Sequence, residues 1–273
     1  MNPIDRTPRS APRISIVIPA RNEARNLEVI LPLLPDVHQV ILVDGNSVDD
    51  TIGAAERVMP DIQVIRQTRT GKGNALACGF AAVTGDIVIM FDADGSADPE
   101  EIPVFVDALL AGADVAKGSR FCEGGGSEDI TPFRRLGNYG LNTLTNVLLG
   151  TRYTDLCYGY NAFWAHIMPS LELPSIHLPR REDGQMHWGD GFEIETVLNI
   201  RIATANMNVV EVPSVEKLRI HGESNLRAVS DGFRVLKTIL AERSRGIRSR
   251  EAYASPLLSE SIIGAELPPR STV

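Results

Sequence analysis

The sequence predicts an α/β fold with a doubly wound, mostly parallel, Rossmann-like sheet and helices on both faces. Short apolar runs alternate with amphipathic stretches through the first 120 residues, and the connections between them are short. This alternation is typical of βαβ units, because parallel strands need a crossover from one to the next. The length of 273 residues and the hydrophobic content of 43% suffice for one large domain, with or without an appendage.

The amino-terminal half supplies most of this sheet. Apolar, β-branched runs predict strands at residues 14–19, 40–43, 62–65, 87–91 and 115–118. Amphipathic stretches predict helices at residues 24–34, 49–58 and 73–83. A further helix is expected because Asp98 is a favoured N-cap residue, Pro99 suits the first helical position and Glu101 stands at the capping-box position. Gly112 is expected to end it.

The carboxyl-terminal half has a looser pattern. It predicts a Gly-rich loop at 122–131, helices at 138–149 and 192–205, a polar loop at 173–191 and a strand at 209–213. Apolar residues at three- and four-residue spacing then predict an amphipathic helix that contains Leu226, Val229, Phe233, Leu236 and Leu240. We expect one domain at residues 14–246, with disordered tails at 1–13 and 247–273.

Charge and composition exclude several classes of protein. The formal net charge of −8 argues against nucleic-acid binding, and no apolar run reaches the roughly 18 residues that span a bilayer. Residues 217–250 carry nine Lys or Arg against three acidic residues, which indicates a local anionic partner. The separated cysteines suit a reducing compartment, and the amino-terminal stretch lacks the apolar core of a secretion signal. We expect a cytoplasmic protein, either free or peripheral on the inner face of the cytoplasmic membrane.

Two aspartates at the end of a predicted strand are the most informative feature. The apolar run at 87–91 stops at Asp92, and Asp94 follows. Open α/β sheets bind their ligands at the carboxyl ends of the strands. Two carboxylates this close repel each other unless a cation neutralises them, and ligation by oxygen alone suits Mg²⁺ or Mn²⁺ bound with a diphosphate. The alternative is a polar strand end that caps the next helix.

Several segments in a fixed order resemble those of the family 2 glycosyltransferases, which have the GT-A fold. The matching segments are residues 19–23, 43–51, 71–73, 92–94, 118–120, 154–155, 191–193 and 219–224. They span roughly residues 14–240 and are most similar to the polyprenyl- and dolichyl-phosphate mannosyl- or glucosyltransferases. The resemblance implies inverting transfer of a hexose from a GDP-mannose or UDP-glucose class nucleotide sugar to polyprenyl phosphate, with Mg²⁺ or Mn²⁺. It assigns binding of the nucleotide-sugar donor to residues 14–120 and binding of the acceptor to residues 121–246.

On the donor side, the resemblance implies that Asp92 and Asp94 hold the metal ion across the diphosphate. The other implied donor contacts are Pro19, Arg21, Glu23, Asp44 and Lys72. The Asp44 carboxylate can accept hydrogen bonds from a base or a ribose, or it can cap the following helix. Lys72 lies between two glycines, where the backbone can approach a diphosphate closely, or it is a surface lysine.

On the acceptor side, Arg120 and Arg219 match arginines that bind the acceptor phosphate in lipid-phosphate relatives, with Ser224 beside them. A planar guanidinium binds phosphate through two hydrogen bonds. A phosphate acceptor is already a nucleophile, whereas a sugar hydroxyl requires a carboxylate base. Asp155 and Glu193 are the candidate bases, and each could instead orient an arginine or the donor sugar. The implied catalytic residues are therefore Arg120, Asp155 and Glu193.

Three departures from the family pattern concern the acceptor. Asn225 stands where relatives often have lysine, residues 158–162 differ from Ser-Gly-Phe-Arg-Ala, and the loop at 178–190 is longer. Transfer to a soluble hydroxyl acceptor is therefore an alternative, and a non-catalytic nucleotide-sugar-binding protein is another. A phosphatase of the haloacid-dehalogenase type is disfavoured, because its nucleophile motif lies on an early strand. Whether the chain forms a homo-oligomer is left open.

Overall fold

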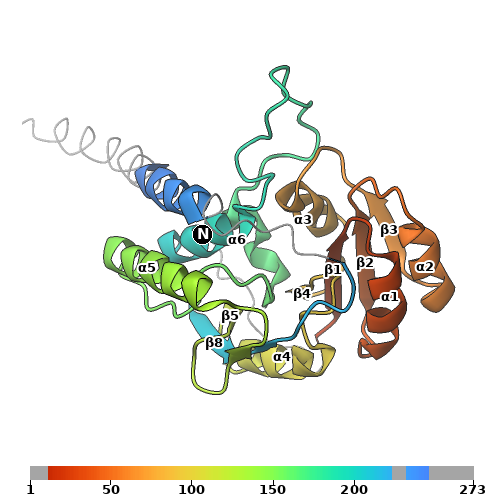
Figure 1. Ribbon diagram of the computed structural model, residues 1–273, viewed down its shortest axis with the longest axis horizontal. Helices are drawn as coiled ribbons and strands as arrows, with labels where there is room; N and C mark the ends of the chain where they lie inside the picture. The colour runs from red at the N-terminus through yellow and green to blue at the C-terminus, as the bar shows by residue number, and fades with distance from the viewer. Residues whose placement is uncertain (1–11, 223–231, 246–273) are drawn as a thin grey trace, which may run out of the picture.

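The computed structural model describes residues 12–222 and 232–245 (Figure 1). The strands are β1 (Ile14–Ala20), β2 (Gln39–Asp44), β3 (Gln63–Arg66), β4 (Ile87–Met90), β5 (Val115–Ser119), β6 (Gly126–Ser127), β7 (Asn161–Trp164), β8 (Val209–Pro213) and β9 (Val215–Glu216). The α-helices are α1 (Ala24–Ile30), α2 (Thr51–Val58), α3 (Lys72–Ala81), α4 (Ile102–Leu110), α5 (Pro132–Leu149) and α6 (Ile194–Thr204). The 3₁₀ segments are η1 (Leu31–Leu33), η2 (Pro99–Glu101) and η3 (Ala165–Leu171). Residues 232–245 are also helical.

A seven-stranded sheet with the order β3-β2-β1-β4-β7-β5-β8 forms the centre. Strand β1 pairs in parallel with β2 and β4, and β2 pairs in parallel with β3. Strand β7 is antiparallel to both β4 and β5, while β5 and β8 are parallel. The carboxyl ends of β1, β2 and β4 therefore meet at one edge, which is where such sheets bind their ligands.

Helices cover both faces of the sheet, as the doubly wound prediction requires. Side chains of β1 alternate between two cores: Ile16 and Ile18 pack with α1, α2 and α4, whereas Val17 packs with α3 and α6. All three are fully buried. A third cluster joins α5, α6 and the helix at 232–245, whose Ile239 is fully buried in it. These helices lie on the same side of the molecule (Figure 1).

Most amino-terminal predictions are confirmed to within two residues at each boundary. The helix expected at 24–34 ends at Ile30 and continues as η1, because Pro32 has no N–H with which to continue the helix. Asp98 caps the helix start by accepting a bond from the Glu100 N–H at 3.1 Å. The capping-box role of Glu101 is wrong, since its carboxylate accepts bonds from Ser214 and Val215 instead.

The carboxyl-terminal half departs further from the sequence predictions. Helix α5 begins at Pro132 rather than at residue 138, because Thr131 caps it by accepting a bond from the Arg134 N–H. Strands β7 and β9 were not expected, and β9 pairs with β6 inside the predicted loop at 122–131. The helix predicted from 226 to 240 is helical from 232, whereas Leu226 and Val229 lie outside the described residues.

The predicted tails lie outside the described residues except at one end. Arg13 was placed in the amino-terminal tail but is held at the sheet, since its backbone N–H and its guanidinium donate to Asp86. In the described part of the chain, no helix combines the length and apolarity needed to cross a bilayer.

Candidate active site

A cavity of about 1500 Å³ lies at the edge where β1, β2 and β4 end. The predicted site residues that line it are Pro19, Arg21, Glu23, Lys72, Asp92, Asp94, Arg120 and Arg219. Three predicted site residues do not line the cavity, namely Asp44, Asp155 and Glu193. Ser224 and Asn225 lie outside the described residues. The cavity thus unites most of the predicted donor contacts with the two predicted acceptor arginines.

Asp92 shares one corner of the cavity with Lys72 and Glu195. The Lys72 ammonium lies 2.7 Å from a carboxylate oxygen of Asp92 and 2.7 Å from one of Glu195. Lys72 opens α3 and Glu195 lies in the first turn of α6, so two helices converge on the end of β4. Burial by itself would lower the pKa of Lys72, but the charges of Asp92 and Glu195 outweigh it and raise the pKa above its usual value.

Glu195 was missed in the sequence, where the neighbouring Glu193 was chosen instead. Both belong to the short run Glu-Ile-Glu at the start of α6. The two glutamates are two positions apart at the start of the helix, so their side chains point in different directions. Glu193 accepts bonds from the loop that precedes α6, whereas Glu195 pairs with Lys72. The signal was therefore present, but which glutamate faces the cavity depends on how α6 is placed.

Gly159 keeps this charged corner open. A Cβ at this position would lie 3.2 Å from a carboxylate oxygen of Asp92, 3.2 Å from the Lys72 ammonium and 3.3 Å from Glu195. These distances are shorter than ordinary van der Waals contacts. A side chain here would press on all three groups, so the absence of a side chain preserves access to the Asp92 carboxylate.

Asp94 forms the adjacent corner with a segment from the far end of the chain. One of its carboxylate oxygens accepts bonds from the Ser96 N–H at 3.0 Å and the Ser96 hydroxyl at 2.6 Å. The other pairs with Arg219 at 3.0 Å, and Arg219 also donates to Glu23 at 2.9 Å. The backbone N–H of Ile220 donates to the Asp94 carbonyl, which holds this segment against the aspartate turn.

The two aspartates fit a divalent cation that shares its coordination with a diphosphate. Among residues 12–222 and 232–245, no group of three or more His, Cys, Asp or Glu side chains is placed to hold a metal ion. Asp92 and Asp94 nevertheless present partly exposed carboxylates to the same cavity, and Gly159 leaves the space beside Asp92 free. Mg²⁺ commonly takes one or two protein carboxylates and completes its shell with phosphate oxygens and water.

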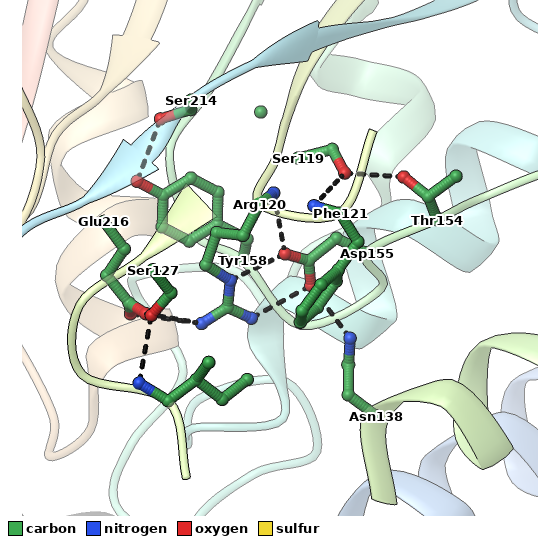
Figure 2. Close-up of polar contacts among 12 residues, drawn as sticks. Ser119, Arg120, Phe121, Ser127, Asn138, Thr154, Asp155, Tyr158, Ser214 and Glu216 are labelled. Carbon is green, nitrogen blue, oxygen red and sulfur yellow. Dashed lines mark hydrogen bonds and ion pairs between the residues drawn. The ribbon is translucent and has the colours of Figure 1, made fainter. Parts of the chain in front are cut away.

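Arg120, which borders the cavity, is largely buried in a network of polar contacts (Figure 2). Its Nε and Nη2 donate to Asp155 at 2.6 and 2.9 Å, and its Nη1 donates to Glu216 at 3.0 Å. The guanidinium also lies 4.8 Å from the ring centre of Tyr158. Burial would lower the pKa of Arg120, but the two carboxylates raise it. All three nitrogens thus donate to carboxylates of the chain, and these bonds fix the orientation of the guanidinium.

Both predicted bases accept hydrogen bonds from other groups of the chain. Asp155 is fully buried; burial would raise its pKa, but the hydrogen bonds from Arg120 hold the pKa below its usual value. Glu193 accepts bonds from the N–H groups of Gly189 and Gly191 at 3.0 and 3.2 Å, so it stabilises the end of the loop at 173–191. This geometry favours the alternative predicted for Asp155, that it orients an arginine.

Asp44 is 2% exposed, and its carboxylate accepts a bond from the Ser47 N–H at 3.2 Å. This contact stabilises the turn after β2, but it is not a cap of α2, which begins at Thr51 with Asp50 at the N-cap position. The adjacent Gly45 and the exposed Arg21 do line the cavity. Nucleotide contact by Asp44 stays a prediction.

The loop at 173–191 packs directly against the Gly-Lys-Gly segment. A buried ion pair anchors it, in which Arg69 donates to both carboxylate oxygens of Asp190 at 2.6 and 2.8 Å. A Cβ at Gly71 would lie 2.1 Å from the Asp190 carbonyl oxygen, and one at Gly73 would lie 1.9 Å from the Gly189 carbonyl oxygen. The two glycines therefore allow the loop to close over the start of α3, where it positions Lys72.

The far end of the cavity is an apolar groove between α5 and the helix at 232–245. Its lining side chains are Ile130, Phe133, Leu136, Leu141, Leu144, Phe192, Phe233, Val235 and Leu236. Gly137 and Gly140 of α5 widen it, since a Cβ at either position would meet nothing within 4 Å. The cavity thus passes from a charged end at the aspartates to an apolar end at α5.

Comparisons with known proteins agree with the sequence resemblance. The sequence model of glycosyl transferase family 2 matches residues 15–168. The chain is 30% identical to an undecaprenyl-phosphate mannosyltransferase of Micrococcus luteus, over 87% of this chain and 98% of that protein. It is 31% identical to a polyprenol monophosphomannose synthase of Mycolicibacterium smegmatis, over 89% of this chain and 91% of that protein. It is 29% identical over 79% of its length to a dolichol-phosphate mannosyltransferase of Pyrococcus furiosus, of which it spans 59%.

The fold is shared with solved structures. Glucosyl-3-phosphoglycerate synthase from Mycobacterium tuberculosis, in complex with Mn²⁺, UDP and glucosyl-3-phosphoglycerate, superposes with a TM-score of 0.65. The identity is 23%, and the match covers 86% of this chain and 81% of that one. The predicted Rossmann-like GT-A architecture is therefore confirmed.

Proposed function

The chain belongs to glycosyltransferase family 2 and is a glycosyltransferase, and we propose that it transfers a hexose from a nucleotide sugar to polyprenyl phosphate. A phosphate oxygen of the acceptor attacks the anomeric carbon as the bond from that carbon to the diphosphate breaks. The nucleoside diphosphate leaves, and the configuration at the anomeric carbon inverts. We take mannose as the sugar, because the relatives aligned over most of their length are named for mannose transfer.

The donor half of this proposal uses the Asp92–Asp94 edge. Mg²⁺ or Mn²⁺ held by these aspartates would supply a Lewis acid that neutralises charge on the leaving diphosphate. Lys72 adds a positive charge of the protein beside them. Such preorganised charges act where negative charge develops in the transition state.

The apolar groove is the single observation that carries the lipid acceptor. It is continuous with the corner that holds Asp94 and Arg219, so one molecule can reach both ends. A small, soluble acceptor would leave the stretch lined by Leu136, Leu144 and Leu236 unfilled, whereas a polyprenyl tail would bury that surface favourably. The relatives named for undecaprenyl-phosphate and polyprenol substrates support the same acceptor class.

The pairing of the acidic residues also supports a phosphate acceptor. Among the described residues, each carboxylate that lines the cavity already pairs with a cationic side chain, and the pairs are Glu23–Arg219, Asp92–Lys72, Asp94–Arg219, Asp129–Arg134, Glu195–Lys72 and Glu216–Arg120. A hydroxyl acceptor needs a carboxylate base, whereas an ionised phosphate needs positioning.

We also propose that the enzyme works as a peripheral protein at the cytoplasmic face of the membrane, where a polyprenyl phosphate would be presented. Large apolar side chains stand exposed at the rim of the groove, among them Phe133 at 64% and Phe233 at 70%. Arg134 and Arg135 lie beside Phe133 and would meet anionic headgroups.

The test is transfer of radiolabel from GDP-mannose, UDP-glucose and other nucleotide sugars, each with Mn²⁺, to polyprenyl phosphate or to 3-phosphoglycerate. We expect label in the organic phase with polyprenyl phosphate and with one preferred donor. Label that stays in the aqueous phase with every donor would overturn the lipid acceptor. Transfer to 3-phosphoglycerate would instead establish the soluble alternative.

A further inference from the structure

Both aspartates of the proposed metal site already hold a cation of the chain. Each cation is also held from its other side by a glutamate. The two sets are Asp92–Lys72–Glu195 and Asp94–Arg219–Glu23. These four of the cavity-lining carboxylates are thus joined in two parallel sets, each with a cation at its centre.

In the first set, the Lys72 ammonium is shared equally, at 2.7 Å from Asp92 and 2.7 Å from Glu195. Glu195 is largely buried at the start of α6, so it can retain the ammonium after Asp92 is taken by another cation. Lys72 has three donor hydrogens, and one remains for a further anion. A diphosphate bound beside Asp92 is within the same corner.

In the second set, Arg219 uses different nitrogens for its two partners. Nη2 lies 3.0 Å from Asp94, and Nη1 lies 2.9 Å from Glu23. Loss of the Asp94 contact would therefore leave the arginine tethered by Glu23 with Nη2 released. The backbone bond from Ile220 to the Asp94 carbonyl does not involve the carboxylate, so it can persist.

We propose that Lys72 and Arg219 are placeholders for the divalent cation, which neutralise Asp92 and Asp94 until the metal ion and the donor diphosphate bind as a unit. This inference rests on the proposed function, because it concerns the same metal and donor. Metal alone must compete with two tethered cations for the aspartate oxygens. Diphosphate alone meets a set of four carboxylates and two cations, whose net charge of −2 repels it.

Each ligand therefore removes the obstacle to the other. The divalent ion makes the set neutral and frees Lys72, and the diphosphate gives Lys72 a new anionic partner. Thermodynamic linkage requires this effect to be reciprocal. The factor by which nucleotide increases the affinity for metal equals the factor by which metal increases the affinity for nucleotide.

The test is binding of Mn²⁺ to the purified protein, followed by the electron paramagnetic resonance signal of free Mn²⁺, without nucleotide and with UDP or GDP. We expect weak binding of Mn²⁺ alone and binding tighter by about tenfold or more with the preferred nucleotide, as for a typical coupling energy. Lys72→Met and Arg219→Met each remove one competitor, so each should bind Mn²⁺ alone about tenfold more tightly than wild type, which is the order of the net value of one partly exposed, charge-assisted contact after desolvation and screening. Lys72→Met should also reduce the coupling between metal and nucleotide.

Lys217→Met is the matched control. Lys217 pairs with Asp98 at 2.5 Å, so its removal changes the local charge equally without vacating Asp92 or Asp94. We expect Mn²⁺ affinity within about twofold of wild type, as for a change in an exposed, screened charge. The two test variants act on different aspartates, so either one decides the question if the other fails to fold.

Two outcomes would overturn the inference in distinguishable ways. If Mn²⁺ binds wild type with nucleotide, yet neither test variant binds Mn²⁺ alone more tightly than the control does, the placeholder role fails and the proposed function stands. If wild type binds no Mn²⁺ with UDP or GDP, the metal-dependent function fails and the placeholder role fails with it.

Discussion

Replacement of Asp155 by asparagine tests whether the Arg120 network is the anchor of the acceptor half. Asp155 is fully buried and accepts two bonds from the guanidinium of Arg120, one of them at 2.6 Å, and a third from the Arg120 backbone N–H. Asparagine has nearly the same shape, but it lacks the charge and offers one acceptor oxygen instead of two. The substitution therefore removes the charge without creating a cavity.

The magnitude follows from the geometry. Two unit charges about 4 Å apart near a protein surface attract by about 4 kcal/mol at an effective dielectric constant of about 20. Glu216 remains at 3.0 Å from Arg120 and retains part of that attraction. We expect a loss of about 3 kcal/mol in the free energy of unfolding, at the lower end of the range for a broken buried pair. A melting temperature lower by about 6 °C corresponds to this loss in a domain of this size.

The pH dependence has a definite sign. The pKa of Asp155 is lowered in the folded protein, so its contribution to stability is present above the unfolded pKa of about 3.9 and is lost as the pH falls through the folded value. The difference between wild type and Asp155→Asn should therefore be the same at pH 7.5 and pH 5. It should shrink only below about pH 4.

Urea unfolding followed by circular dichroism, with melting curves at each pH, measures these differences. Asp129→Asn is the matched control, because Asp129 forms an exposed pair with Arg134 at 2.9 Å. We expect it to cost less than about 0.5 kcal/mol. A loss below about 1 kcal/mol for Asp155→Asn, or a loss equal to that of the control, would refute the reasoning.

Three further predictions concern other parts of the chain. Lys117 is fully buried, and burial lowers its pKa. Lys117→Met should therefore raise the free energy of unfolding by about 1 kcal/mol or more at pH 7. Urea titrations should show that this gain fades toward pH 10.5, where the lysine of the wild type loses its proton in both the folded and the unfolded state. Leu136→Glu should raise KM for polyprenyl phosphate about tenfold by charging the groove, whereas the equally exposed Val147→Glu, outside it, should leave KM unchanged; equal effects would contradict the groove assignment. Cys157 lines the cavity and is only partly buried, but desolvation raises the pKa of its thiol to about 12. Mass spectrometry should therefore find it unmodified by iodoacetamide at pH 8, and rapid labelling would contradict the raised pKa.

The sequence by itself determined the features that depend on neighbouring residues. Strand β4 and the aspartates after it are encoded in one short run, because a buried strand needs consecutive apolar residues and the end of that strand is where the run stops. The Asp98 cap depends on an equally local pattern. The fold class followed from the order of such elements, and the ordered motifs identified the family without any knowledge of contacts.

The tertiary structure decided which charges meet. Arg219 was assigned to the acceptor but lies on Asp94, and its other partner, Glu23, is 196 positions away along the chain. Glu195 rather than Glu193 faces Lys72, because the placement of α6 selects which side of the helix start borders the cavity. The short β7 was invisible for the same reason, since its antiparallel partners β4 and β5 lie far earlier in the sequence. Local patterns carry no information about such pairings, which are chosen only when the sheet and the helices pack together.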